Sequence, residues 1–220
     1  NTEYLINDLT GKGKKMLAEG AQGTMLDVDF GSYPFVTSSN TISAGACTGL
    51  GISPKRIGEV FGIFKAYCTR VGSGPFPTEL NDNTGDNLRN IGHEFGSTTG
   101  RPRRCGWLDL PALKYAIMIN GVTQLFMTKS DVLSGFPNIK VCVSYLSEGN
   151  KCLEIPFNNS PVEPVYTELP GWKENISGIR DFEKLPENLR KYIKFVEEQT
   201  SVPVTMVSVG PDRDETIFRK

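Results

Sequence analysis

Apolar residues recur at helical spacing in four stretches of the chain. The clearest stretch covers residues 186–200, where charged side chains occupy one face and apolar ones the other: Leu189, Tyr192, Ile193 and Val196. A second strong pattern runs over residues 108–120, and weaker patterns run over residues 1–9 and 84–91. We therefore predict a helix in each of these stretches.

Short apolar runs between these helices are typical of buried strands. They cover residues 16–19, 60–64, 124–127, 140–146 and 204–207. We expect residues 60–64 to form a central strand and residues 204–207 the last strand. Because strands alternate with helices, we predict an α/β fold in which a mainly parallel sheet is flanked by helices, with residues 1–220 forming a single unit.

Three stretches have the glycine, proline and small polar residues of loops: 20–50, 72–77 and 156–178. We expect the last of these to be irregular, with Trp172 packing it down. Within the first, Thr37 to Thr41 lines up five short hydrogen-bonding side chains before a small-residue segment. Such a run caps a helix N-terminus or faces an anionic ligand, and both interpretations stay open.

Charge and cysteine content narrow the class of protein. The 24 basic residues nearly balance the 25 acidic ones, so we expect no affinity for nucleic acid. Five cysteines without metal-ligand spacing and a single histidine, His93, make a zinc site improbable and favour a reduced, cytoplasmic protein. We see no signal peptide, and no apolar run reaches the roughly eighteen residues of a membrane span.

The stretch from Gly96 to Trp107 concentrates candidate chemistry. It holds three arginines, two threonines and three glycines in twelve residues. Arg101 and Arg103 each carry a planar guanidinium that matches the oxygens of a carboxylate or phosphate, and glycines allow close approach of the backbone. Composition alone fits an anion site and a surface loop equally well.

A second candidate motif follows the strand predicted at residues 124–127. Thr128-Lys129-Ser130-Asp131 has the pattern with which GTP-binding proteins commonly read guanine. The carboxylate of Asp131 can accept from guanine N1–H and from the exocyclic amine, while the Lys129 stem covers the ring. A solvated Lys–Asp turn is the alternative interpretation of this motif. The Gly210-Pro211 turn after the last strand also has two interpretations: its backbone wraps a flat base, or it is only a turn.

Taken together, motifs along the whole chain resemble the adenylosuccinate synthetase family, and specifically its C-terminal half. They are Glu19–Gly23, Asp27–Gly31, Tyr33-Pro34, Val36–Ser39, Lys65–Tyr67, Thr69–Gly72, Gly74–Glu79, Thr98–Arg101, Gly106–Asp109, Thr128–Asp131 and Gly210–Arg213. The resemblance implies the C-terminal portion of a P-loop-NTPase-like fold. It also implies that the glycine-rich phosphate loop, the catalytic aspartate and histidine, and most magnesium ligands belong to an N-terminal half outside this sequence.

The resemblance further implies that GTP drives the joining of IMP to L-aspartate, with Mg²⁺ as cofactor and a homodimer as the full-length form. The implied contacts are Gln22, Thr37, Val71 and Arg101 for IMP; Ser97, Thr98, Thr99, Gly100, Arg101, Pro102 and Arg103 for aspartate; and Arg103, Lys129, Ser130, Asp131, Ser208, Val209, Gly210 and Pro211 for GTP. Pro102 replaces a residue that is usually basic in the family, which puts the shape of the arginine loop in doubt. We assign no catalytic residue, no metal ligand and no role for His93.

Two classes of function therefore remain. The threonine–arginine loop favours a purine-synthesis ligase, whereas the lack of a phosphate loop favours a non-catalytic guanine-nucleotide-binding or assembly module for this polypeptide alone. In either case we expect the 220-residue chain by itself to be inactive.

Overall fold

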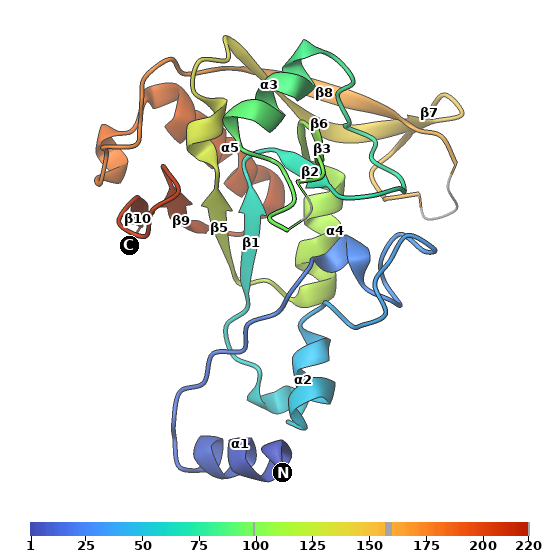
Figure 1. Cartoon of the computed structure of the whole chain (residues 1–220), viewed down its shortest axis with the longest axis vertical. Coiled ribbons are helices and arrows are strands. Elements are labelled where there is room, and N and C mark those ends of the chain that lie inside the picture. Colours follow the sequence, from blue (N-terminus) through green and yellow to red (C-terminus); the bar gives the residue numbers. More distant parts are fainter. Residues whose placement is uncertain (99, 157–159, 220) are drawn as a thin grey trace.

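A computed structural model describes residues 1–98, 100–156 and 160–219. Its central sheet contains β1 (Phe61–Lys65), β5 (Gln124–Thr128), β9 (Val204–Ser208) and β10 (Thr216–Phe218), in that spatial order. β1, β5 and β9 run parallel, and β10 is antiparallel to β9 (Figure 1). The predicted α/β fold with a mainly parallel sheet is confirmed.

A second sheet is built around the long strand β6 (Asn138–Ser147). β4 (Leu108–Asp109) pairs with it in parallel, while β7 (Asn150–Cys152) and β8 (Glu163–Pro170) pair with it antiparallel. A short antiparallel pair, β2 (Cys68–Arg70) with β3 (Arg104–Gly106), joins the segment after β1 to the arginine stretch.

Helices form where the apolar spacing predicts them. They are α1 (Thr2–Gly11), α3 (Asn83–Ile91), α4 (Leu110–Asn120) and α5 (Glu187–Thr200), and a short helix α2 (Ala44–Leu50) adds to them. The four apolar positions of α5 are all buried, and α5 packs against α4. Short 3₁₀ turns cover Thr24–Leu26, Pro54–Arg56, Ser130–Leu133 and Phe182–Lys184.

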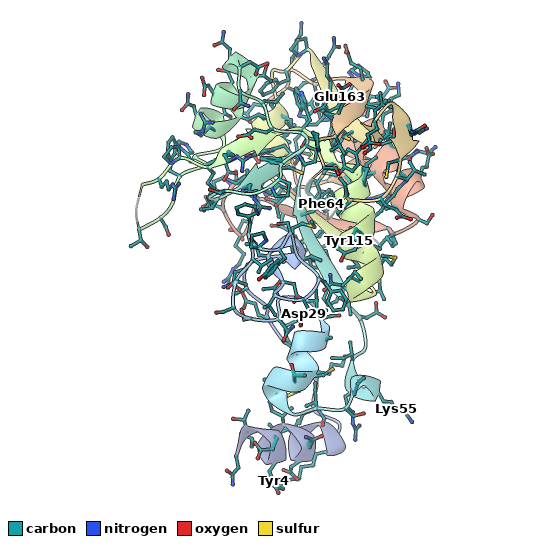
Figure 2. All side chains as sticks on the ribbon, turned by 90° about the vertical axis from the view of Figure 1, so that its right-hand side faces the viewer. Tyr4, Asp29, Lys55, Phe64, Tyr115 and Glu163 are labelled. Atoms are coloured by element: carbon teal, nitrogen blue, oxygen red, sulfur yellow. The ribbon has the colours of Figure 1, made fainter. Side chains whose placement is uncertain are left out.

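The core lies between the helices and the two larger sheets. Trp172 is 1% exposed, packs edge-on against Tyr192 and donates from its indole nitrogen to the Ser134 hydroxyl at 3.1 Å, so it anchors its segment as predicted. By contrast, α1 and α2 lie at one end of the molecule, away from the sheets (Figure 1). In Figure 2 the labelled Tyr4 and Lys55 mark this end, opposite Glu163 on β8.

Several predicted strands differ from the structure. Residues 16–19 form no strand, and Leu17 is 82% exposed, because the segment crosses from α1 to the next loop without a partner strand among the described residues. β1 lies at the edge of the central sheet, with Ile63 73% exposed, rather than in its centre. β10 follows the strand that we expected to be the last.

The prediction of an irregular stretch at 156–178 is wrong over β8 (Glu163–Pro170), which has a proline as its second residue, Pro164, and as its last, Pro170. Proline disrupts an interior strand, but among the described residues β8 pairs only with β6, and an edge strand tolerates proline. Of the two interpretations left open for Thr37 to Thr41, the helix cap is not observed. The helix α2 starts at Ala44, and Ser43 before it makes no capping bond through its side chain.

Candidate functional site

The carboxyl ends of three parallel strands meet at one edge of the central sheet. Lys65, at the end of β1, lies beside Thr128 at the end of β5, and Met127 lies beside Val207 near the end of β9. Open parallel sheets usually bind ligands at this edge because the loops that leave the strands converge there. The strand ends therefore position the predicted guanine motif and part of the arginine region together.

Asp131 follows β5 in the 3₁₀ turn Ser130–Leu133. The turn begins after Lys129, whose backbone is left-handed with φ of 62° and whose ammonium donates to the Gly92 carbonyl at 2.9 Å. The Oδ1 atom of Asp131 is buried and has no hydrogen-bond partner among the described residues. Burial raises the pKa of the Asp131 carboxyl above its ordinary value. A buried acceptor without a donor is costly, so this atom is suited to accept from a ligand.

The turn after β9 packs directly against this motif. The Ser130 hydroxyl donates to the Ser208 carbonyl, and the Ser208 hydroxyl donates to the Gly210 carbonyl at 2.7 Å. A Cβ on Gly210 would lie 2.1 Å from a carboxylate oxygen of Glu215, so the Glu215 side chain packs directly against this glycine. Val209 is buried and Pro211 is exposed. The structure thus brings together both segments that were predicted to read guanine.

The arginine loop is a tight hairpin. Phe95 bridges Pro102, and the Gly96 amide donates to the Arg101 carbonyl at 2.9 Å. Gly100 has φ of 63°, a conformation that favours glycine, and its amide donates back to Gly96 at 2.8 Å. These bonds need no amide from Pro102, so the proline leaves the hairpin intact.

Exposed residues gather at the tip of this hairpin. They are Ser97, Thr98, Gly100, Arg101 and Pro102, whereas the predicted contact Thr99 lies outside the described residues. Their side chains are accessible to a ligand from solvent, and two of them are hydroxyl donors beside a guanidinium.

The other two arginines of the stretch are half-buried and differ in environment. Arg103 donates from Nη1 to Glu94 at 2.8 Å, while its Nε is buried without a partner among the described residues. Arg104 points elsewhere: it binds both carboxylate oxygens of Glu79 and donates to the Gly74 carbonyl at 2.9 Å. Arg104 therefore holds a loop in place, which agrees with its absence from the ligand contacts that the family resemblance implies.

The predicted IMP contacts are only partly connected to this region. Val71 is 58% exposed directly after β2, where Arg70 donates to the Ser32 hydroxyl and the Phe35 carbonyl, both at 3.1 Å. These bonds tie the turn before Thr37 to the segment of Val71. Gln22 is exposed with φ of 63°, and the hydrogen bonds given for the described residues do not place it relative to the arginine loop.

Sequence reasoning missed a buried carboxylate that organises the loop before α2. Asp27 is fully buried and accepts from the backbone amides of Asp29, Phe30, Thr41 and Ile42. Burial by itself raises the pKa of Asp27, but these four amides hold it below its ordinary value. The sequence feature that could have indicated this role is the position of Asp27 at the start of a stretch rich in turn-forming residues. Tyr115 on α4 secures the same loop by donating to the Phe30 carbonyl at 2.8 Å, and Figure 2 shows Tyr115 facing this region.

Among the described residues, no group of three or more His, Cys, Asp or Glu side chains is arranged to hold a metal ion. Over the same part of the chain, no helix is both long and apolar enough to cross a lipid bilayer.

Comparison with known proteins gives the family. Residues 1–217 match the family model for adenylosuccinate synthetase. The adenylosuccinate synthetase of Parabacteroides distasonis is 62% identical over 220 residues, and that of Bacteroides thetaiotaomicron is 61% identical; this chain is covered fully in both, and 52% of each relative is covered.

Solved structures agree with this result. A fully ligated adenylosuccinate synthetase from Plasmodium falciparum superposes with a TM-score of 0.93 at 45% identity, covering all of this chain and 53% of that one. A succinoaminodeoxyadenylate synthetase of cyanophage S-2L shares the fold, with a TM-score of 0.63 at 20% identity over 98% of this chain and 49% of its own. The chain thus spans about half the length of these relatives, and it belongs to the adenylosuccinate synthetase family.

Proposed function

We propose that the full-length protein containing this chain ligates IMP to L-aspartate to form adenylosuccinate, with GTP converted to GDP and phosphate. The observation that carries the proposal is the buried Oδ1 of Asp131, which lies beside the Ser208 to Pro211 turn and has no hydrogen-bond partner among the described residues. Family membership supports a ligase of purine biosynthesis and leaves the nucleotide and the substrates to be tested.

Guanine suits the acceptor at Asp131. Its N1–H and exocyclic amine are adjacent donors, so one carboxylate can accept from both. Adenine has an acceptor at N1 and no amine at C2, and it would leave the Asp131 carboxylate unpaired. The carbonyls and amides around Gly210 would then border the base, and Lys129 would cover one face of the ring.

The arginine hairpin suits a substrate with two carboxylates. In our proposal Arg101 lies between aspartate and IMP, and Arg103 meets aspartate and the GTP phosphates. Ser97 and Thr98 at the exposed tip supply hydroxyl donors to aspartate. Thr37, Val71 and Gln22 would contact IMP.

The chemistry makes the C6 oxygen of IMP a leaving group. This oxygen attacks the γ-phosphorus of GTP as the N1 proton of IMP is released, the bond from that phosphorus to the β–γ bridging oxygen breaks, and GDP departs. The neutral aspartate amine then attacks C6, the C6–O bond breaks, phosphate leaves, and the amine nitrogen releases one proton. Both steps require positioning and neutralisation of charge, which guanidinium groups supply. By family resemblance Mg²⁺ belongs with the GTP phosphates and the N-terminal half, and we assign it no ligand in this chain.

Adenylosuccinate formation by the full-length protein tests the proposal. Product should require IMP, aspartate and GTP together, and omission of any one should abolish it. The 220-residue chain alone should make none, because the phosphate loop and catalytic groups implied by the family lie outside it. Product from the chain alone would contradict that expectation, and no product from the full-length protein would refute the proposed function. A protein that binds GTP tightly without making product would be a nucleotide-binding module instead.

A further inference from the structure

A buried carboxylate lies where helix α3 leads into the arginine hairpin. Glu94 is 1% exposed and accepts from three different side chains. Its Oε1 accepts from the Lys65 ammonium at 2.7 Å and from the Tyr67 hydroxyl at 2.6 Å, and its Oε2 accepts from Arg103 at 2.8 Å. Burying a carboxylate is costly unless it is paired and hydrogen-bonded, and these donors offset that cost.

Each donor is itself fixed by its surroundings. Lys65 ends β1 and also donates to the Thr69 hydroxyl at 2.9 Å. Tyr67 is 1% exposed, and its hydroxyl lies so close to Gly92 that a Cβ there would be 2.3 Å away. Glu94 is therefore held in one position from the sheet side, independently of Arg103.

Glu94 in turn restrains Arg103 through both backbone and side chain. The Arg103 amide donates to the Glu94 carbonyl at 2.9 Å, and its Nη1 donates to the Glu94 carboxylate. The Arg103 carbonyl also accepts from Arg89 at 2.8 Å. In the Arg103 guanidinium, Nη1 is hydrogen-bonded to Glu94, and the buried Nε has no partner among the described residues. The guanidinium is thus oriented before any ligand arrives.

The charges around Glu94 do not cancel. Lys65, Arg103 and Lys129 lie close enough to influence one another, and burial, with repulsion from the other two, lowers the pKa of Lys65 although Glu94 opposes this. Hydrogen bonds from Lys65 and Tyr67 hold the pKa of Glu94 below its ordinary value although burial raises it. The Asp131 carboxylate also interacts with Lys129, so two carboxylates lie among three cations, and the cluster keeps a net positive charge beside the strand ends that suits an anionic ligand.

We propose that Glu94 is a positioning residue of this site: it holds Arg103 in the orientation that meets the anionic groups of aspartate and GTP, and it joins that arginine to Lys65 at the end of β1. The inference rests on the proposed function. A purely structural Glu94 would instead stabilise the fold without setting substrate affinity.

The test compares two isosteric substitutions in the full-length protein. Glu94→Gln removes the charge that holds Arg103. Glu197→Gln is the control, because Glu197 is a half-buried carboxylate that likewise accepts from an arginine, Arg219 at 2.6 Å, and it lies on α5 away from the arginine hairpin. Melting temperature and steady-state kinetics for all three substrates are measured for both variants.

Glu94→Gln should raise the KM for aspartate about ten- to hundredfold and the KM for GTP in the same direction, with the KM for IMP changed less than about threefold. Glu197→Gln should lower the melting temperature and leave every KM at the unsubstituted value. An unchanged aspartate KM in active, folded Glu94→Gln would overturn the inference, as would equal kinetic effects in both variants.

Two further results separate the possible failures. If the unsubstituted full-length protein makes no adenylosuccinate, the proposed function is wrong and this inference falls with it; if it is active, only the inference is at stake. If Glu94→Gln does not fold, Tyr67→Phe removes one neutral donor from the same carboxylate. That variant should raise the aspartate KM by about threefold or more, and an unchanged value would overturn the inference.

Discussion

Asp131→Asn is the substitution that most sharply tests the proposed reading of guanine. The change keeps the side-chain shape but converts one acceptor oxygen into an NH₂ donor. In this structure Oδ1 of Asp131 is buried and has no hydrogen-bond partner among the described residues, so it is available to a ligand donor. In the proposed complex the new donor of the asparagine would face the exocyclic amine of guanine.

The expected cost follows from the bonds that change. A hydrogen bond to a charged group contributes about 1.5–3 kcal/mol, and asparagine keeps one acceptor for guanine N1–H. One lost bond together with donor–donor repulsion therefore costs about 3 kcal/mol, which corresponds to roughly a hundredfold rise in the KM for GTP.

Xanthine provides the complementary measurement. It carries a carbonyl where guanine carries the amine, so it can accept from the new donor. We expect Asp131→Asn to form adenylosuccinate with XTP, while the unsubstituted protein strongly prefers GTP. The exposed Asp214, which lies just beyond the Gly210 turn, supplies the control substitution Asp214→Asn, and its nucleotide preference should not change.

Initial rates of adenylosuccinate formation with GTP and XTP, in the full-length protein and both variants, give the answer. If Asp131→Asn uses GTP as well as the unsubstituted protein does, Asp131 is a turn residue and the base is read elsewhere.

Two further predictions follow from the same region. Arg101→Leu in the full-length protein should depress aspartate use and turnover together, by about 30- to 1000-fold in kcat/KM. Arg56→Leu is the control, because Arg56 is exposed near α2, whereas Arg104 is unsuitable because its bond to Glu79 holds a loop. Equal losses of kcat/KM in Arg101→Leu and Arg56→Leu would mean that the hairpin is only a general basic patch. Burial raises the pKa of Asp131, and only the ionised carboxylate accepts from both guanine donors. GTP affinity should therefore be constant above that pKa and fall by about tenfold per pH unit below it. Titrations over a pH series check this, and the same pH dependence in Asp131→Asn would contradict it.

Local patterns in the sequence predicted most of the helices and several of the strands. Helix α5 was clear because its four apolar positions form one face, and all four are buried. Residues 16–19 and β8 show the limit of such patterns, since whether an apolar run becomes a strand depends on a partner strand from elsewhere in the chain. Leu17 finds no such partner in the described residues, whereas the proline-bounded β8 pairs with β6.

The candidate site was predictable to a similar degree. Asp131 and the Gly210-Pro211 turn were predicted from short motifs at strand ends and Ser208 from the family resemblance, and the parallel sheet brings those strand ends together. Glu94 could not be found in this way, because its role comes from donors 29 and 27 residues earlier in the chain and one nine residues later. The carboxylate partners of Arg103 and Arg104, Glu94 and Glu79, were equally hidden, because they are set only by folding; the family resemblance had given a ligand role to Arg103 and none to Arg104.

The ratio of kcat/KM for GTP to that for ATP, in adenylosuccinate formation by the full-length protein, tests the central claim most directly. The Asp131 carboxylate, whose Oδ1 has no partner among the described residues, can accept from guanine N1–H and from the guanine amine through its two oxygens, whereas adenine N1 offers it no donor. We predict a ratio of at least about a hundred, since two charge-assisted hydrogen bonds are at stake. Equal use of ATP and GTP, with product formed from both, would contradict the guanine site at this edge of the sheet.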